Sequence, residues 1–221
     1  MMLIYQPLHA ALGWFGRMGK CLLCLAWLAL SGCQSIPSGT NSPNSSNSSL
    51  SLSTEQKLAV IRTQIAEQLL SMGRLDDAKV QLDTALAYHA KYAPAYRIMA
   101  MVYQASAEPT HQQYANTLYQ KAIAIDASDM QNYMDYGNYL AQMGDDAAAI
   151  RQFERPAMTI GYHGRLTAIE NIAFVRYRQF NRQPTDDSHH QAKTALQRAI
   201  QAGSQSQELV QAYQLLLSYN N

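Results

Sequence analysis

From Thr54 onward, apolar and small residues recur at the spacing of a helix face, in segments that repeat about every 34 residues. Each segment contains two such faces separated by a short turn, which predicts a pair of antiparallel helices. The segments cover residues 54–92, 93–129, 130–163 and, with a weaker match, 164–204. The pattern therefore predicts an all-α fold with one helix pair in each segment.

Small residues occupy two fixed places in every segment. Counted from Ala59, Ala93, Met130 and Leu166, the eighth place, in the first helix, holds Ala66, Ala100, Gly137 and Ala173. The twentieth place, in the second helix, holds Ala78, Ala115, Ala149 and Ala192 when the extra turn residues of the second and fourth repeats are left out of the count. Small side chains at both places let the paired helices approach closely, and bulkier apolar residues fill the space between them. Gly73 and Gly144 lie in the turn of two segments, where a residue without a Cβ favours the end of a helix.

These positions resemble the tetratricopeptide repeat (TPR), a helix-turn-helix unit that stacks into a superhelix. The resemblance implies a right-handed superhelix of about four repeats. Residues 205–221 carry one further apolar face, with Gln214 at the eighth place. We expect a C-terminal helix that caps the array. Its predicted face consists of Leu209, Val210, Tyr213, Leu216 and Leu217.

Three features depart from the repeat pattern. The second repeat has about three extra residues in its turn, around 106–110, and the fourth has about seven, in 181–189, relative to the repeat. We expect the second insertion to form a long turn. Pro156 replaces a small residue in the third repeat and is expected to shorten or kink that helix.

The N-terminus has the pattern of an export signal. Arg17 and Lys20 precede an unbroken apolar run, Cys21 to Leu30, which is too short to span a bilayer. The junction Leu30-Ser31-Gly32-Cys33 resembles the bacterial lipobox. The resemblance implies a lipoprotein signal peptide over 1–32 and acylation of the Cys33 thiol. Because the next residue is Gln34 and not Asp, it also implies an outer-membrane lipoprotein that faces the periplasm.

A linker follows the expected lipid anchor. Residues 33–53 are mostly Ser, Asn, Pro, Gly and Thr, and they lack the apolar surface that would offset the entropy of ordering. We predict a disordered tether between the membrane and the repeats. An O-glycosylated stalk is the alternative.

Composition and charge exclude several classes of function. The formal net charge is +1, and no basic stripe alternates with aromatic residues, so nucleic acid is not expected as a partner. The three cysteines all lie within the first 33 residues, which excludes a disulfide framework in the repeats. Cys21 and Cys24 have the spacing of a redox or metal pair, but they belong to the apolar run.

Catalytic motifs are also missing from the sequence. The six histidines form no HExxH motif, and no glycine-rich phosphate loop is present. His189 and His190 fall in the expected long turn, where we predict a solvated loop with adventitious metal binding as the alternative. Asp76-Asp77 and Asp145-Asp146 recur at equivalent turns, which favours a role at helix N-termini. We therefore expect no enzymatic activity, no metal or other cofactor and no small-molecule substrate.

TPR geometry implies a partner-binding groove formed by the first helix of each repeat. Hydrophobic anchors for a bound segment are expected from Leu70, Met101, Met134 and Phe174, with packing against neighbouring helices as the alternative for each. The predicted groove residues are Val60, Thr63, Glu67, Leu70, Arg97, Met101, Gln104, Met134, Asn138, Gln142, Phe174 and Tyr177.

Signal, lipobox, tether and a small TPR array together resemble the type IV pilus biogenesis lipoproteins of the PilF/PilW pilotin group. That resemblance implies a pilotin, which aids the localisation and multimerisation of a PilQ-like secretin by binding it. One alternative is a TPR lipoprotein adaptor for a cell-wall synthesis or other envelope complex. The other is a lipoprotein enzyme acting on murein, for which the sequence offers no catalytic constellation.

Overall fold

The computed structural model describes residues 52–106 and 108–219. The chain divides into two compact units, and the described residues belong to the second, Ser48–Asn221. The predicted signal peptide, the lipidation of Cys33 and the linker up to residue 51 lie outside the described residues. Those predictions are therefore untested by the structure.

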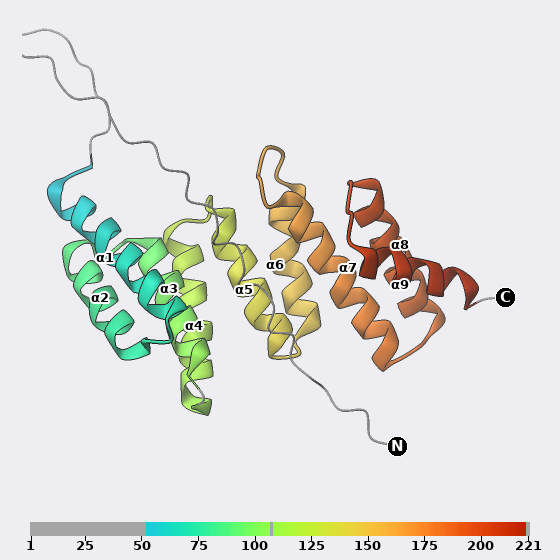
Figure 1. Ribbon diagram of the computed structural model, residues 1–221, viewed down its shortest axis with the longest axis horizontal. Coiled ribbons are helices and arrows are strands. Elements are labelled where there is room, and N and C mark those ends of the chain that lie inside the picture. The colour runs from blue at the N-terminus through green and yellow to red at the C-terminus, as the bar shows by residue number, and fades with distance from the viewer. Residues whose placement is uncertain (1–51, 107, 220–221) are drawn as a thin grey trace, which may run out of the picture. The chain divides into compact units, whose positions relative to one another are not determined.

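The described residues form nine α-helices and no strands (Figure 1). Their bounds are α1 Thr54–Ser71, α2 Leu75–Tyr88, α3 Ala93–Ala105, α4 Pro109–Ile125, α5 Met130–Gln142, α6 Asp146–Met158, α7 Arg165–Arg182, α8 Asp186–Gln201 and α9 Gln207–Ser218.

The helices pack in the order of the chain. α1 packs against α2, α3 against α4, α5 against α6 and α7 against α8, and each pair contacts the next one (Figure 1). The first helices also contact each other across the repeats, as α1 does with α3 and α3 with α5. This stacking of helical hairpins confirms the prediction of an all-α TPR array.

Local sequence sets the helix ends. Ser53 caps α1 by accepting a hydrogen bond from the Gln56 backbone, and the Gln56 side chain accepts one from the Ser53 backbone. Gly73 and Gly144 follow α1 and α5 with φ of 74° and 82°, a conformation that glycine adopts without the cost borne by other residues. The next amide, of Arg74 after α1, donates back to the Leu69 carbonyl and closes the helix end.

The core forms where small and bulky residues face each other. Every small residue at the eighth place of α1, α3 and α7 has no exposed surface, and the same holds for the alanines at the twentieth place. In the third repeat the eighth residue is Gly137. A Cβ on Gly137 would lie 2.6 Å from Cε1 of Phe153, so this ring occupies the space that a side chain would need. The large ring and the absent side chain together keep α5 and α6 close.

The insertion in the fourth repeat does not form the long turn that we predicted. Instead α7 continues to Arg182 and α8 begins at Asp186, so most of the added residues lengthen the two helices. His189 lies in α8 and is 6% exposed, with Nε2 2.9 Å from the Leu216 carbonyl oxygen. The prediction of a solvated loop at His189 is therefore wrong. The Thr185 side chain caps α8 at the Ser188 amide and thereby fixes the start of the helix after the insertion.

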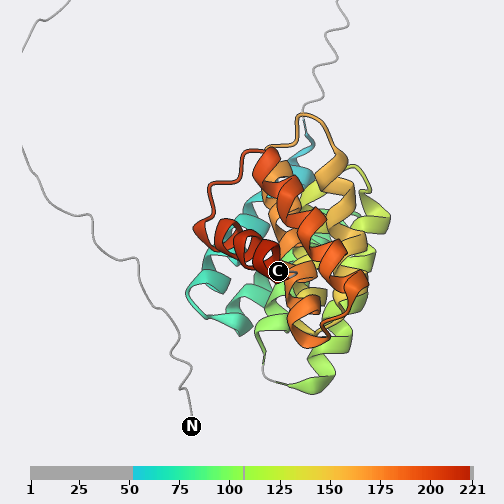
Figure 2. The ribbon, with the colours of Figure 1, turned by 90° about the vertical axis from the view of Figure 1, so that its right-hand side faces the viewer.

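Pro156 and the C-terminal helix also differ in detail from the pattern. α6 ends at Met158, two residues after the buried Pro156, whose nitrogen cannot donate to the Gln152 carbonyl one turn earlier. α9 packs against α8 and α7 at the C-terminal end of the array (Figure 2). Its buried face holds Leu209, Ala212 and Leu216, whereas Leu217, which we had placed on that face, is 44% exposed.

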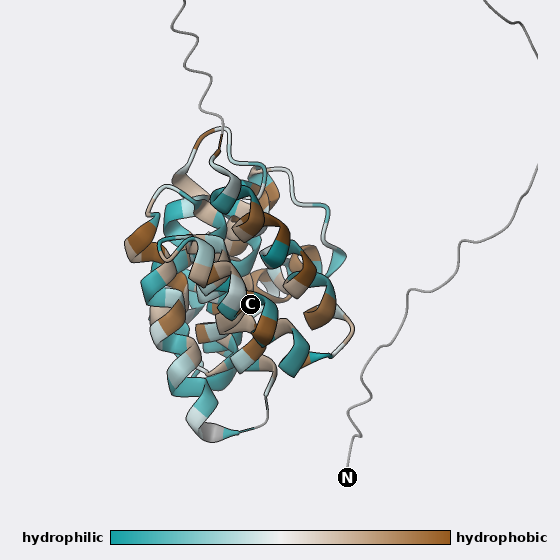
Figure 3. Ribbon diagram, turned by 90° about the vertical axis from the view of Figure 1, so that its left-hand side faces the viewer, coloured by the Kyte–Doolittle hydropathy of each residue, from teal (hydrophilic) through white to brown (hydrophobic). Residues whose placement is uncertain are grey.

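The opposite end of the array presents α1 and α2 (Figure 3). Ile61 and Ile65 of α1 are 50% and 37% exposed, although the equivalent residues of later repeats are buried against the preceding helix pair. Gln64 and Gln68 share this exposed side of α1. None of the described helices combines the length and apolar content needed to cross a membrane.

Candidate partner-binding surface

The predicted groove residues lie on the first helices α1, α3, α5 and α7, and we call these twelve residues the first-helix surface. Glu67, Asn138 and Gln142 are exposed. The members that are half-buried, and that therefore present part of the side chain to solvent, are Val60, Leu70, Arg97, Met101, Gln104, Phe174 and Tyr177. Of these, Leu70, Met101, Phe174 and Tyr177 also pack against the core.

Two members of this set are not accessible. Met134 is 5% exposed and belongs to the core, so the expectation that it offers a hydrophobic anchor is wrong. Thr63 is 5% exposed, and its hydroxyl donates to the Ala59 carbonyl oxygen at 2.9 Å within α1. Both residues follow the helical spacing of the surface, but adjacent helices cover them. Helix geometry places a residue on a side of its helix, and only the packing of neighbours decides whether that side is open.

A buried polar network joins α3 to α5. Arg97 Nη1 lies 2.7 Å from Asp135 Oδ2, and the two side chains are only 14% and 13% exposed. Gln131 donates to the other oxygen of Asp135 at 2.9 Å, and the Tyr162 hydroxyl donates to Gln131 at 3.1 Å. Arg97 therefore acts mainly between repeats, and its charge is already matched. The TPR pattern pointed to Arg97 as a groove residue and not to Asp135, which occupies the sixth place of its repeat.

Amide side chains link the first helices further along. Gln104 of α3 donates to Gln142 of α5 at 2.6 Å, and Asn171 of α7 donates to Asn138 of α5 at 3.1 Å. The Tyr119 hydroxyl of α4 donates to the side-chain amide oxygen Oε1 of Gln104 at 2.7 Å. These contacts hold adjacent repeats at a fixed spacing. They also fix the orientation of the amides that a bound chain would meet.

Buried tyrosines fill the space between α4 and α5 next to these amide contacts. Burial raises the pKa of the Tyr119 phenol well above its ordinary value, and the nearby Asp135 carboxylate adds to that shift. Burial likewise raises the pKa of Tyr139, whose hydroxyl donates to the Gln112 carbonyl oxygen at 2.6 Å. The Tyr119 ring is stacked on Tyr136 with centroids 5.6 Å apart. The junction of repeats two and three is therefore filled by neutral, hydrogen-bonded phenols.

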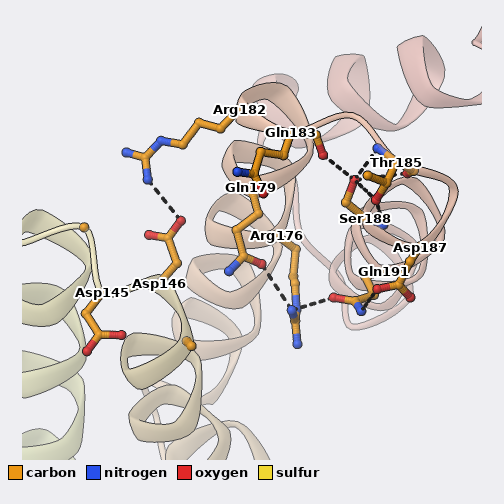
Figure 4. Close-up of a pocket in the computed structure, with 12 residues that line it drawn as sticks. Asp145, Asp146, Arg176, Gln179, Arg182, Gln183, Thr185, Asp187, Ser188 and Gln191 are labelled. Atoms are coloured by element: carbon orange, nitrogen blue, oxygen red, sulfur yellow. Dashed lines mark hydrogen bonds and ion pairs between the residues drawn. The ribbon is translucent and has the colours of Figure 1, made fainter.

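A second ion-pair cluster joins α6 to α7. Asp145 caps α6 by accepting from the Ala148 amide at 3.0 Å, which agrees with the predicted role at a helix N-terminus. Asp146 is 7% exposed and pairs with Arg182 at 3.3 Å (Figure 4). It also pairs with Arg178. From the sequence we expected Asp146 to act only through the helix dipole. Its arginine partners lie 32 and 36 residues away, so only the stacked repeats reveal the pairing.

The arrangement suits the binding of a polypeptide. Half-exposed apolar residues on α1, α3 and α7 alternate with oriented amides on α3 and α5, which match the apolar side chains and the backbone groups of a peptide. Within the described residues, no group of three or more His, Cys, Asp or Glu side chains is placed to hold a metal ion.

The described residues form stacked helical hairpins, with a surface made by the first helix of each hairpin. This arrangement is that of TPR proteins. No family model matches the chain, and no curated protein matches it by sequence. Among solved structures, PilF of Pseudomonas aeruginosa aligns with a TM-score of 0.64 and 21% identity, over 76% of this chain and 71% of PilF. PilW, described as a widely conserved type IV pilus biogenesis factor, aligns with a TM-score of 0.59 and 19% identity, over 72% and 70% of the two chains.

The fold is shared more widely than these two proteins. MamA aligns with a TM-score of 0.57 and 15% identity, over 73% of this chain and 82% of MamA. At such identities the likeness establishes the TPR fold. The fold alone does not establish a partner, because similar arrays serve different functions.

Proposed function

We propose that this protein is a lipid-anchored scaffold of the outer membrane that acts as a pilotin in type IV pilus biogenesis. The observation that carries the proposal is the common fold with PilF and PilW over about three quarters of the chain, at TM-scores of 0.64 and 0.59. The lipobox-like junction at Cys33 supports the anchor, and Gln34 supports the outer membrane.

In this proposal the first-helix surface binds a segment of the secretin. Leu70, Met101 and Phe174 supply apolar contacts, and the amides of Gln104 and Gln142 supply hydrogen bonds to the bound backbone. The protein contributes binding energy and position, and it performs no chemical step on its partner. Binding would bring the secretin to the membrane in which it assembles.

The direct test is a pull-down from solubilised cell envelopes with the full chain. We expect enrichment of the secretin over other outer-membrane proteins. Recovery of cell-wall synthases without a secretin would overturn the pilotin proposal and favour the adaptor for a cell-wall complex.

Two matched variants locate the contact. Met101→Gln keeps the length of a half-buried side chain but makes its end polar, and we expect it to reduce secretin recovery about tenfold, the effect of losing one buried apolar contact. Val80→Thr is the control, because Val80 is 61% exposed on the second helix α2 and the change nearly keeps its shape. Both variants need melting temperatures close to that of the wild type. Equal losses of secretin recovery in the two variants, or no loss in either, would exclude the first-helix surface as the contact.

A further inference from the structure

The fourth repeat breaks the packing pattern at one position of its first helix. The eleventh place of the first three repeats holds a bulky apolar residue, Leu69, Tyr103 or Leu140, whereas α7 has Arg176 there. Leu140 is 8% exposed and Leu69 and Tyr103 pack against the core. A guanidinium cannot fill that apolar space without a partner, so the replacement changes what this side of α7 can contact.

Arg176 is held in place by amides and not by an acid. Its Nη1 donates to Gln179 at 3.1 Å and to Gln191 at 2.6 Å (Figure 4). The Gln191 amide nitrogen donates to Asp187 at 2.8 Å, which turns the Gln191 oxygen toward Arg176. These bonds fix the guanidinium between α7 and α8 and use one of its nitrogens. Its positive charge has no carboxylate partner within the described residues.

A pocket of about 260 Å³ opens beside Arg176 between α7 and α8. Its apolar floor comes from Ile169, Ile172 and Ala195, and its rim comes from Arg176, Arg198 and His190. The rim contains no acidic residue, and Arg198 also lacks an ion-pair partner in the described part of the chain. Arg176 also lines the neighbouring cavity, which contains the acids Asp145, Asp146 and Asp187. There Asp146 pairs with Arg182, Asp145 caps α6, and Asp187 accepts from Gln191.

We propose that this pocket binds an acidic side chain of a partner protein, with an adjacent apolar side chain on the floor. The carboxylate pairs with Arg176 and Arg198, and the apolar side chain covers Ile169, Ile172 and Ala195. The acidic side chain complements the two guanidinium groups, which have no carboxylate partner, and the apolar side chain complements the apolar surface below them. The volume accommodates one or two side chains and not a whole helix.

This contact lies outside the first-helix surface. Arg176 is at the eleventh place of its repeat and faces α8, whereas the groove residues Phe174 and Tyr177 occupy the ninth and twelfth places. The pocket therefore allows a partner to be held at two places, or two partners to be held at once. It does not require that the partner be a secretin.

The test uses two short peptides and the full chain in non-ionic detergent. The probes are acetyl-Leu-Glu-Leu-amide and acetyl-Leu-Gln-Leu-amide, which differ by one charge at nearly constant shape. NMR of the arginine Nε–H groups reports contact at each guanidinium. We expect the glutamate peptide to shift the Arg176 and Arg198 signals and to bind about tenfold more tightly than the glutamine peptide.

Variants distinguish binding in the pocket from nonspecific attraction of the peptide to positive charge. Arg176→Leu restores the residue type of the other repeats and should abolish the preference for glutamate, as should Arg198→Gln at an exposed position. Arg62→Leu is the matched control, because Arg62 donates to Gln81 across α1 and α2 at 2.8 Å, and it should keep the preference. Equal binding of the two peptides would overturn the proposal. So would shifts at Arg176 and Arg198 that are produced by phosphatidylglycerol added to the detergent micelles and not by the glutamate peptide.

Discussion

Arg97 of α3 and Asp135 of α5 form an ion pair of 2.7 Å whose side chains are 14% and 13% exposed. The pair joins the first helices of two successive repeats across a sequence separation of 38 residues. It is the centre of a network that also includes Gln131 and Tyr162. A residue predicted to face a partner is therefore part of the framework that shapes the surface.

Breaking this pair should destabilise the protein. Asp135→Ala leaves Arg97 largely buried without its partner, and we expect the free energy of unfolding to fall by about 2–3 kcal/mol. Urea denaturation measures the change. The control Arg74→Ala removes the exposed pair with Asp77, whose side chains are 58% and 53% exposed, and should cost less than about 1 kcal/mol. Similar costs for the two variants would contradict a buried network at Asp135.

Gly137 and Phe153 should be energetically coupled. Gly137→Ala places a methyl group 2.6 Å from the ring, so overpacking of about 1–3 kcal/mol outweighs the gain of about 1 kcal/mol in helix propensity. The double variant Gly137→Ala with Phe153→Leu has alanine and leucine at these two places. The first repeat has the same two residue types there, as Ala66 and Leu82.

A double-mutant cycle tests this coupling. We expect the double variant to lose at least about 1 kcal/mol less than the sum of the single variants. Additive losses would mean that the ring relieves the clash by moving elsewhere.

Alkaline conditions should destabilise the junction of repeats two and three. The folded state raises the pKa of Tyr119, so ionisation is easier in the unfolded chain, and stability is lost as the pH rises through the ordinary tyrosine pKa of 10.0. We expect the free energy of unfolding to decline above that pH and the decline to be shallower in Tyr119→Phe. The variant also loses the bond to Gln104, which costs about 1 kcal/mol near neutral pH. An identical decline in both proteins would exclude Tyr119 as a source of the alkaline destabilisation.

The proposed lipid anchor depends on the thiol of Cys33. Cys33→Ala removes the thiol that acylation requires, and we expect the protein to move from the membrane fraction to the soluble fraction with an unchanged melting temperature. Fractionation and circular dichroism measure these two properties. Continued membrane association of the variant would refute anchoring through Cys33.

The repeat pattern in the sequence determined the fold. Small residues at the eighth and twentieth places recur because close helix pairs need them, and Gly73 and Gly144 mark turns that need a positive φ. Such local requirements are visible in one chain. The weaker fourth repeat was still identified, but its insertion was misread because helix lengthening and loop formation have similar compositions until packing decides. His189 shows this, since its burial depends on Leu216 of α9.

The sequence by itself therefore determined the helices, their pairing and the side of each first helix that faces away from its partner helix. Only the tertiary structure decided which of those residues are accessible, because exposure depends on neighbours one repeat away. Met134 is covered, Arg97 is paired with Asp135, and Asp146 binds arginines of the next repeat. Arg176 was visible in the sequence as an exception to an apolar position. The stacking of α7 on α8 turned that exception into a fixed, unmatched charge beside an apolar pocket.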